Sequence, residues 1–218
     1  EDNKSSSTNP YRNIPDVQFW KKSVAEVPLS DVDPVGSTRF SIDKADRVAT
    51  AGSCFAQHIA RTLSKSGFNY FVTETAPENV STDEASLRNY GVFSARYGNI
   101  YTARQFAQLF QRVDRKFNPV DNYWLRKDGR IVDPFRPQIE PEGFASLADL
   151  EASRNEHFNA IIQMFRETDV FVFTLGLTEG WRSKIDGAVF PLAPGAAGGE
   201  RDFDKYEVVN RTISEVVS

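Results

Sequence analysis

The only cysteine of the chain, Cys54, lies between a short apolar run and an amphipathic stretch. Residues 48–51 read Val-Ala-Thr-Ala, and Gly52-Ser53-Cys54 leads from them toward residues 57–66. This order predicts a strand, a sharp turn and a helix. Ser53 and Cys54 would then lie in the first helical turn, where unpaired N–H groups and the helix dipole favour a thiolate or an oxyanion. An α/β fold presents a nucleophile in this way, and a thiolate attacks acyl groups well.

His58 follows Cys54 by four residues on the expected helix. At about 100° per residue the two side chains are only about 40° apart, so the imidazole could accept the thiol proton. The opposite face carries the apolar residues Phe55, Ala56, Ile59, Ala60 and Leu63. Two alternatives stay open. Cys54 could be a small packed residue of a helix that Ser53 caps, and His58 could be a solvated histidine without a chemical role.

Further segments predict the sheet that positions this turn. Residues 68–73 predict a second strand, and residues 170–173, Val-Phe-Val-Phe, predict a central parallel strand. A helix is expected over residues 148–167, with the inward residues Leu150, Phe158, Ile161, Ile162 and Phe165. We therefore predict an α/β fold, a three-layer sandwich with a mostly parallel, flavodoxin-like sheet. Its site would lie at the carboxyl ends of the strands after Ala51 and Phe173.

Other elements surround this framework. Thr102 is expected to cap a helix whose inward face carries Ala103, Phe106, Phe110 and Val113. Asp128-Gly129 and Asp186-Gly187 predict two β-hairpin insertions. Residues 206–217 predict an amphipathic helix. The proline-containing residues 1–46 are expected to form an arm that packs on one domain, residues 47–218.

The pentapeptide Gly52-Ser53-Cys54-Phe55-Ala56 resembles the name-giving motif of the GSCFA family. Residues 174–181 resemble the second signature of that family, and the resemblance runs from about residue 9 onward. GSCFA proteins are similar to SGNH (GDSL-type) esterases and acyltransferases. The resemblance places Cys54 at the nucleophile position and Ser53 at the preceding position. It also implies a further strand and a final segment, so we expect a truncated chain.

The same resemblance implies where an oxyanion would be bound. SGNH relatives use the N–H of the nucleophile, a glycine and an asparagine, and the matching positions here are Gly98, Asn99, Gly176 and Thr178. Thr178 stands where asparagine is expected. The relatives take their histidine from a late segment, whereas this chain has no histidine after His157, which we interpret as structural. Simple turn roles for the two glycines are the alternative.

Glu179 and Trp181 follow on the same loop and could bind a sugar hydroxyl and stack on a pyranose ring. By family analogy we expect an acyl hydrolase or O-acyltransferase acting on an acylated carbohydrate or another acyl-carrying small molecule. The alternative function is a non-catalytic glycan-binding or assembly module with an incomplete relay. For Trp181 itself, the alternative to stacking on a sugar is a buried residue at the root of the hairpin. The sequence leaves the acyl donor, the acceptor and the oligomeric state open.

The composition of the chain bears on which partners, cofactors and compartments can be expected. The 218 residues carry 26 Lys plus Arg against 30 Asp plus Glu, a net charge of −4 that argues against nucleic acid as the main partner. No apolar run approaches the roughly 20 residues that span a bilayer. The glycine-rich residues 195–199 lack the lysine of a P-loop, and two isolated histidines make no zinc site, so we expect no cofactor. The cytoplasm is the expected compartment, with a removed signal peptide as the alternative.

Overall fold

The computed structural model describes residues 9–33 and 36–217, and the chain divides into two compact units, residues 1–42 and 43–218. The first unit contains the 3₁₀ helices η1 (Asp16–Gln18) and η3 (Leu29–Asp31) and the π-helical turn η2 (Lys21–Ala25). Pro15 and Pro28 directly precede η1 and η3, because the fixed φ of proline suits the entry to a helix. The packing of this arm on the second unit stays a prediction.

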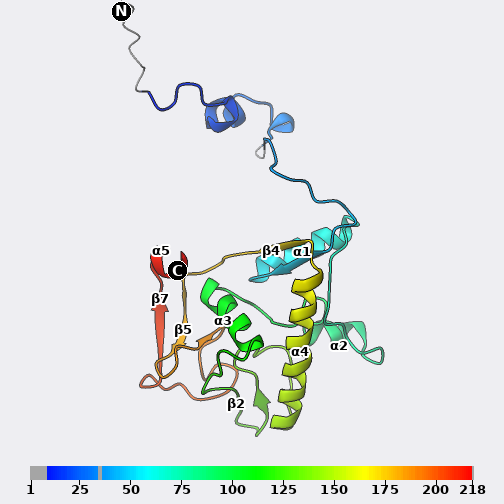
Figure 1. The fold of residues 1–218 in the computed structure, drawn as a ribbon, viewed down its shortest axis with the longest axis vertical. Helices are drawn as coiled ribbons and strands as arrows, with labels where there is room; N and C mark the ends of the chain where they lie inside the picture. The colour runs from blue at the N-terminus through cyan, green and yellow to red at the C-terminus, as the bar shows by residue number, and fades with distance from the viewer. Residues whose placement is uncertain (1–8, 34–35, 218) are drawn as a thin grey trace, which may run out of the picture. The chain divides into compact units, whose positions relative to one another are not determined.

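The second unit is a mixed assembly of helices and short strands (Figure 1). Its elements are β1 (Val48–Ala51), α1 (Cys54–Lys65), α2 (Thr82–Leu87), α3 (Ala103–Val113), β2 (Trp124–Leu125), β3 (Ile131–Val132), α4 (Leu147–Glu167), β4 (Val170–Phe173), β5 (Glu179–Ser183), β6 (Val189–Phe190), β7 (Tyr206–Asn210) and α5 (Ile213–Val217). The strand, turn and helix expected around Cys54 are confirmed as β1, a turn and α1.

The parallel sheet is small. β1 pairs with β4 in parallel, with Val48 opposite Val170 and Ala51 opposite Phe173. On the other side of β1, Tyr70 makes a single parallel bridge to Val48. The strand predicted over residues 68–73 is therefore wrong as a regular strand. The segment turns away after this bridge, and the N–H of Thr73 donates to the carbonyl of Ser94 instead.

Two antiparallel sheets complete the second unit. β2 and β3 form the expected hairpin around Asp128-Gly129, and β5 lies between β6 and β7. The helix predicted over residues 206–217 is wrong in its first part. Residues 206–210 form β7, which pairs along β5 from Ser183 opposite Tyr206 to Glu179 opposite Asn210, and only α5 is helical. The structure thus supports a mixed α/β fold, with less parallel sheet than the sequence predicts.

The main core lies where α3 and α4 pack against β1 and β4. Its side chains include a group of contacting aromatic rings, Phe106, Phe110, Phe165, Phe171 and Phe173. Ile162 was expected inside but is 36% exposed. On α3 the expected residues are half-buried, and the deepest positions are Gln108, Leu109 and Arg112. Polar side chains therefore occupy core positions that hydrophobic periodicity does not detect.

Candidate active site

Gly52 makes the turn after β1 possible. Its φ of +138° is rarely adopted by other residues, and a Cβ there would overlap the Thr174 hydroxyl and lie 2.8 Å from the Thr174 carbonyl oxygen. The close approach lets the N–H of Thr174 donate to the carbonyl of Ala51 at 3.1 Å. The N–H of Ser53 donates to the Thr174 hydroxyl at 3.4 Å. The ends of β1 and β4 therefore meet at this turn.

Ser53 and Cys54 have the local roles that the sequence predicts for a helix start. Ser53 is the N-cap of α1, and its Oγ accepts from the N–H of Phe55 at 3.4 Å. Cys54 is the first residue of α1, and its side chain is exposed. The N–H of a first helical residue has no acceptor within the helix, so the Cys54 amide can donate to a ligand. A reachable thiol thus lies beside a free donor and the positive end of the helix dipole.

Three chain segments meet at this turn through main-chain hydrogen bonds. The N–H of Ile100 donates to the carbonyl of Gly52 at 2.8 Å. The carbonyl of Tyr101 accepts from the N–H groups of Gly176 and Leu177 at 3.3 and 3.0 Å. Residues 98–101 and the loop after β4 are therefore held beside the turn of residues 52–54, as the meeting of strand ends in an α/β fold predicts. We call residues 52–54 the nucleophile turn, after the candidate nucleophile Cys54.

Asn99 and Tyr101 lie close to the start of α1. Oδ1 of Asn99 accepts from Nε2 of Gln57 at 3.3 Å. Burial raises the pKa of the Tyr101 hydroxyl, the neighbouring Cys54 raises it further, and a hydrogen bond with Asn99 lowers it. Tyr101 therefore keeps its proton at neutral pH and presents a donor near the thiol. Gly98 has a φ of +67° and open space around an added Cβ, so it is needed for its backbone conformation and not for a close approach.

Gly176 and Thr178 have different surroundings. A Cβ at Gly176 would lie 3.6 Å from both Cβ and Oγ of Ser53, so this glycine contacts the nucleophile turn. Thr178 is engaged elsewhere, because its Oγ1 donates to Oδ1 of Asn210 at 2.7 Å and its carbonyl accepts from the N–H of Arg211. The side chain of Thr178 is thus bonded to the end of β7.

The two histidines differ in access. His58 is exposed on α1, and within the described residues no hydrogen bond joins its ring to the Cys54 thiol. Phe55, expected on the apolar face, is 64% exposed. Of the other expected residues of that face, Ala56 and Ala60 are buried, and Ile59 and Leu63 are half-buried. Cys54 and His58 therefore both lie on the exposed side of α1, and His58 is the titratable residue nearest to Cys54 in sequence.

His157 lies in the interior, where its contacts agree with a structural role. Nδ1 is 2.7 Å from Oε2 of Glu74, and the side chain is fully buried. Burial lowers the pKa of His157 to about 4, and the charge of Arg136 acts in the same direction. The ring is therefore neutral at pH 7 and donates its Nδ1–H to the Glu74 carboxylate.

A pocket of about 350 Å³ is lined by Tyr101, Leu177, Glu179, Trp181 and Phe190, together with other residues. Its walls are mostly apolar, and Glu179 supplies a carboxylate at the beginning of β5. Tyr101 connects the two parts of the site, because it borders this pocket and interacts with Cys54. The nucleophile turn and the predicted binding residues Glu179 and Trp181 therefore belong to neighbouring parts of one surface.

Tyr101, Thr174 and Gln57 were not selected from the sequence. Tyr101 directly precedes the helix cap Thr102, and only the fold brings it to the thiol. Thr174 follows the apolar run of β4, where a residue at a strand end could have been noticed. Gln57 is one turn after Cys54 on α1, and this helical spacing was the signal that could have identified it.

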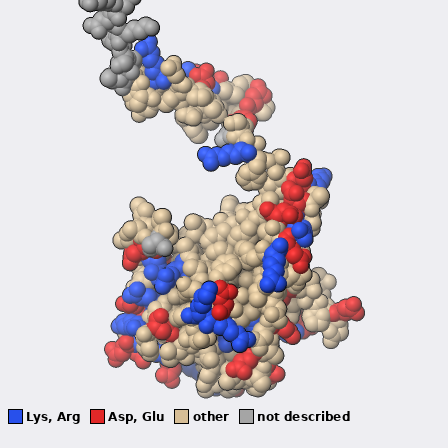
Figure 2. Space-filling view, in the orientation of Figure 1, with Lys and Arg blue, Asp and Glu red and all other residues tan. Residues whose placement is uncertain are grey.

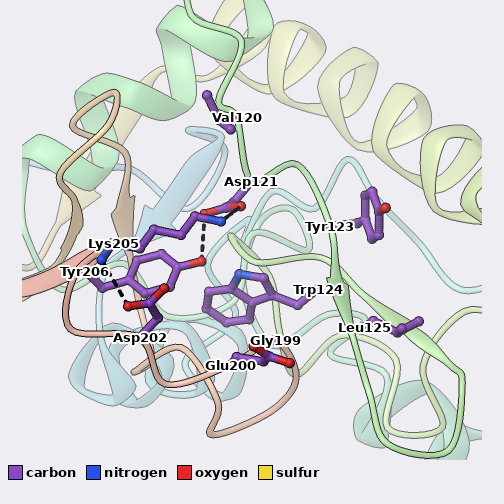
Figure 3. A pocket seen from close by; sticks show the side chains of 10 residues that line it. All are labelled: Val120, Asp121, Tyr123, Trp124, Leu125, Gly199, Glu200, Asp202, Lys205 and Tyr206. Atoms are coloured by element: carbon purple, nitrogen blue, oxygen red, sulfur yellow. Dashed lines mark hydrogen bonds and ion pairs between the residues drawn. The ribbon is translucent and has the colours of Figure 1, made fainter.

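A second pocket of about 350 Å³ lies beside Trp124 (Figure 3). The carboxylate of Asp121 accepts from Nζ of Lys205 at 2.5 Å and from the Tyr206 hydroxyl at 2.7 Å. The described residues that line this pocket include no cysteine, serine, threonine or histidine. Asp121, one of three acidic residues that line this pocket, is already paired within the fold, and we place the candidate active site at Cys54.

Other kinds of site find little support. Within residues 9–33 and 36–217, no group of three or more His, Cys, Asp or Glu residues could hold a metal ion. Over the same residues, no helix is both long enough and apolar enough to cross a bilayer. Acidic and basic side chains are interspersed on the face drawn in Figure 2, without an extended region of one sign.

Comparison with known proteins identifies one relationship. The family model described as the GSCFA family matches residues 47–218. No curated protein and no solved structure matches the chain. The matched range contains the nucleophile turn, the loop after β4 and the pocket at Tyr101.

Proposed function

Because the chain belongs to the GSCFA family, we propose that it is an SGNH-like acyl hydrolase or O-acyltransferase with Cys54 as its nucleophile. The observation that carries the proposal is the exposed thiol on the first residue of α1, beside β4 and Tyr101. The substrate of hydrolysis, or the product of transfer, is an acylated carbohydrate. A three-layer, flavodoxin-like arrangement of the SGNH type is part of the same proposal.

In the first step the Cys54 thiolate attacks an ester carbonyl and forms a tetrahedral oxyanion. The Cys54 N–H and the Asn99 amide supply hydrogen bonds to this oxyanion, and the Tyr101 hydroxyl is a third donor. Collapse of the intermediate breaks the ester C–O bond, and the leaving alkoxide takes the proton that the His58 imidazole accepted from the Cys54 thiol. The product is a thioester on Cys54.

In the second step water or a sugar hydroxyl attacks the thioester and releases the thiol. His58 is the candidate base, because it is exposed on the same helix and His157 is sealed against Glu74. The apolar pocket beside Tyr101 takes the acyl group or one face of a sugar ring, with Glu179 accepting from a hydroxyl.

The test uses an activated acetyl ester and mass spectrometry of the intact chain. We expect acetylation of Cys54, loss of turnover in Cys54→Ala and partial activity in Cys54→Ser. Tyr101→Phe should lower kcat by about 10²–10³-fold, as for loss of one oxyanion donor. Ser66→Ala, at the exposed far end of α1, is the matched control. Full activity of Cys54→Ala would contradict the proposal and make Ser53 the next candidate.

A second candidate function is glycan binding without turnover. It is favoured by one observation, that Thr178 is bonded to Asn210 and His157 to Glu74, so neither is available as a relay group. In this case the wild type would not acetylate, and Trp181→Ala would abolish retention on a polysaccharide column while Cys54→Ala would leave it unchanged. Acetylation of Cys54 with steady turnover would reject this candidate.

A further inference from the structure

Three arginines in the interior of the second unit lie within electrostatic reach of one carboxylate, Asp133. Arg112 and Arg136 are 7% and 2% exposed, and Arg154 is half-buried beside them. Asp133 is 1% exposed, and its Oδ2 accepts from Nε of Arg136 at 3.2 Å and from Nε of Arg154 at 3.3 Å. Its Oδ1 accepts from the N–H of Phe135 at 3.0 Å. Both oxygens are therefore engaged by groups other than Arg112.

Arg112 has no anionic partner within the described residues. Its side chain makes no hydrogen bond there and no ion pair within 4.0 Å. The guanidinium instead lies 3.7 Å from the ring centroid of Phe135. Burial lowers the pKa of Arg112 to about 9, with Asp133 opposing this shift and the other two arginines adding to it. A buried cation of this kind is costly unless a charge neutralises it.

Arg136, which lines the same cavity as Arg112, has a buried N–H donor without a hydrogen-bond partner in the described part of the chain. This donor is Nη1, and the nearest carboxylate oxygen, Oε1 of Glu74, is 3.9 Å away. That distance is too long for a hydrogen bond. Arg112, Arg136 and Gln105 line a cavity of about 20 Å³. Oε1 of Gln105 accepts from the main chain, so its NH₂ group remains as a further donor.

We propose that this cavity binds one chloride-sized monovalent anion between Arg112 and Arg136. The lining supplies two guanidinium groups and an amide donor. The two carboxylates near Arg136, those of Asp133 and Glu74, are already engaged by other donors. The volume accommodates about one water-sized sphere, which excludes sulfate and phosphate. A water molecule fits as well, but it brings no charge to offset the surplus of arginines. The site lies behind residues 97–101 and is independent of the activity proposed for Cys54.

The first test measures the Tm in sodium chloride and in sodium gluconate at equal ionic strength. For a dissociation constant of about 10 mM, about 200 mM chloride would raise the Tm by about 4–7 °C relative to gluconate. Arg112→Met should abolish this difference. Arg126→Met, which removes an arginine from the β2–β3 hairpin, is the matched control and should keep it. Equal Tm values of the wild type in the two salts would overturn the proposal.

The second test does not depend on a variant that folds. Crystals of the wild-type protein grown with bromide should show an anomalous peak between Arg112 and Arg136, and its absence would overturn the proposal. The two tests also separate an anion from water. In gluconate, Arg112→Met should unfold at a temperature equal to or above that of the wild type, because an apolar side chain replaces an uncompensated cation. A loss of several degrees there would contradict the assigned role of Arg112.

Discussion

Acid should destabilise the second unit through His157. The buried ring has its pKa lowered from 6.5 to about 4 by burial and by Arg136. Because the pKa is lower in the folded state, the unfolded chain binds the proton first as the pH falls. The contribution of the neutral His157 ring to the free energy of unfolding is therefore fully present above pH 6.5, and it is lost progressively as the pH falls from 6.5 to about 4. At 1.36 kcal/mol per unit, the loss is about 3 kcal/mol.

The assay is urea unfolding, followed by tryptophan fluorescence at steps between pH 7 and pH 4. His157→Gln keeps an amide donor for Glu74 but does not titrate, so its free energy of unfolding should fall by about 3 kcal/mol less than that of the wild type. His58→Gln removes an exposed histidine and is the matched control, with a pH dependence like that of the wild type. Parallel curves for the wild type and His157→Gln would refute the reasoning.

Two substitutions test the packing around the site. Gly52→Ala and Gly91→Ala both place a side chain at positive φ, +138° and +69°, but only the first drives a Cβ into the backbone of Thr174. We expect the positive φ to cost each variant about 1–3 kcal/mol of unfolding free energy, and the overlap with Thr174 to cost Gly52→Ala about 1–3 kcal/mol more. Equal losses of unfolding free energy in urea would contradict the close approach at Gly52. Arg96→Met breaks two ion pairs of a side chain that is 4% exposed, and should cost about 3–5 kcal/mol; a loss below about 1 kcal/mol would show that the pairs are not buried in solution.

The nucleophile turn could be predicted because its signals are local. An apolar run, a glycine and a capping serine appear in order over residues 48–53, and each acts on its immediate neighbours. Residues 206–210 could not be assigned in the same way. The sequence Tyr-Glu-Val-Val-Asn fits the hydrophobic pattern of a helix as well as that of a strand. It forms a strand because it pairs with the edge of β5 that β6 leaves free, a partner distant in sequence.

The buried charges were not predictable from residue type. Glu74, Arg96 and Asp133 are far apart in sequence and belong to classes that are mostly exposed. Only the fold brings them together, and the same packing seals His157 away from the surface. The arrangement around Cys54 was partly predictable for a related reason. Topology predicts which strand ends meet, but not that the side chain of Tyr101 interacts with the thiol.

The hydrogen bonds that join the three segments at Cys54 are made almost wholly by main-chain atoms. The side chains of Asn99, Tyr101 and Glu179 project from this framework and take no part in those main-chain bonds. Substitution at these three positions should therefore change what the surface recognises without unfolding the turn that carries the thiol. Such a division between a main-chain frame and replaceable side chains makes the site evolvable, and we expect a library randomised at these positions to yield new ligand preferences in one fold.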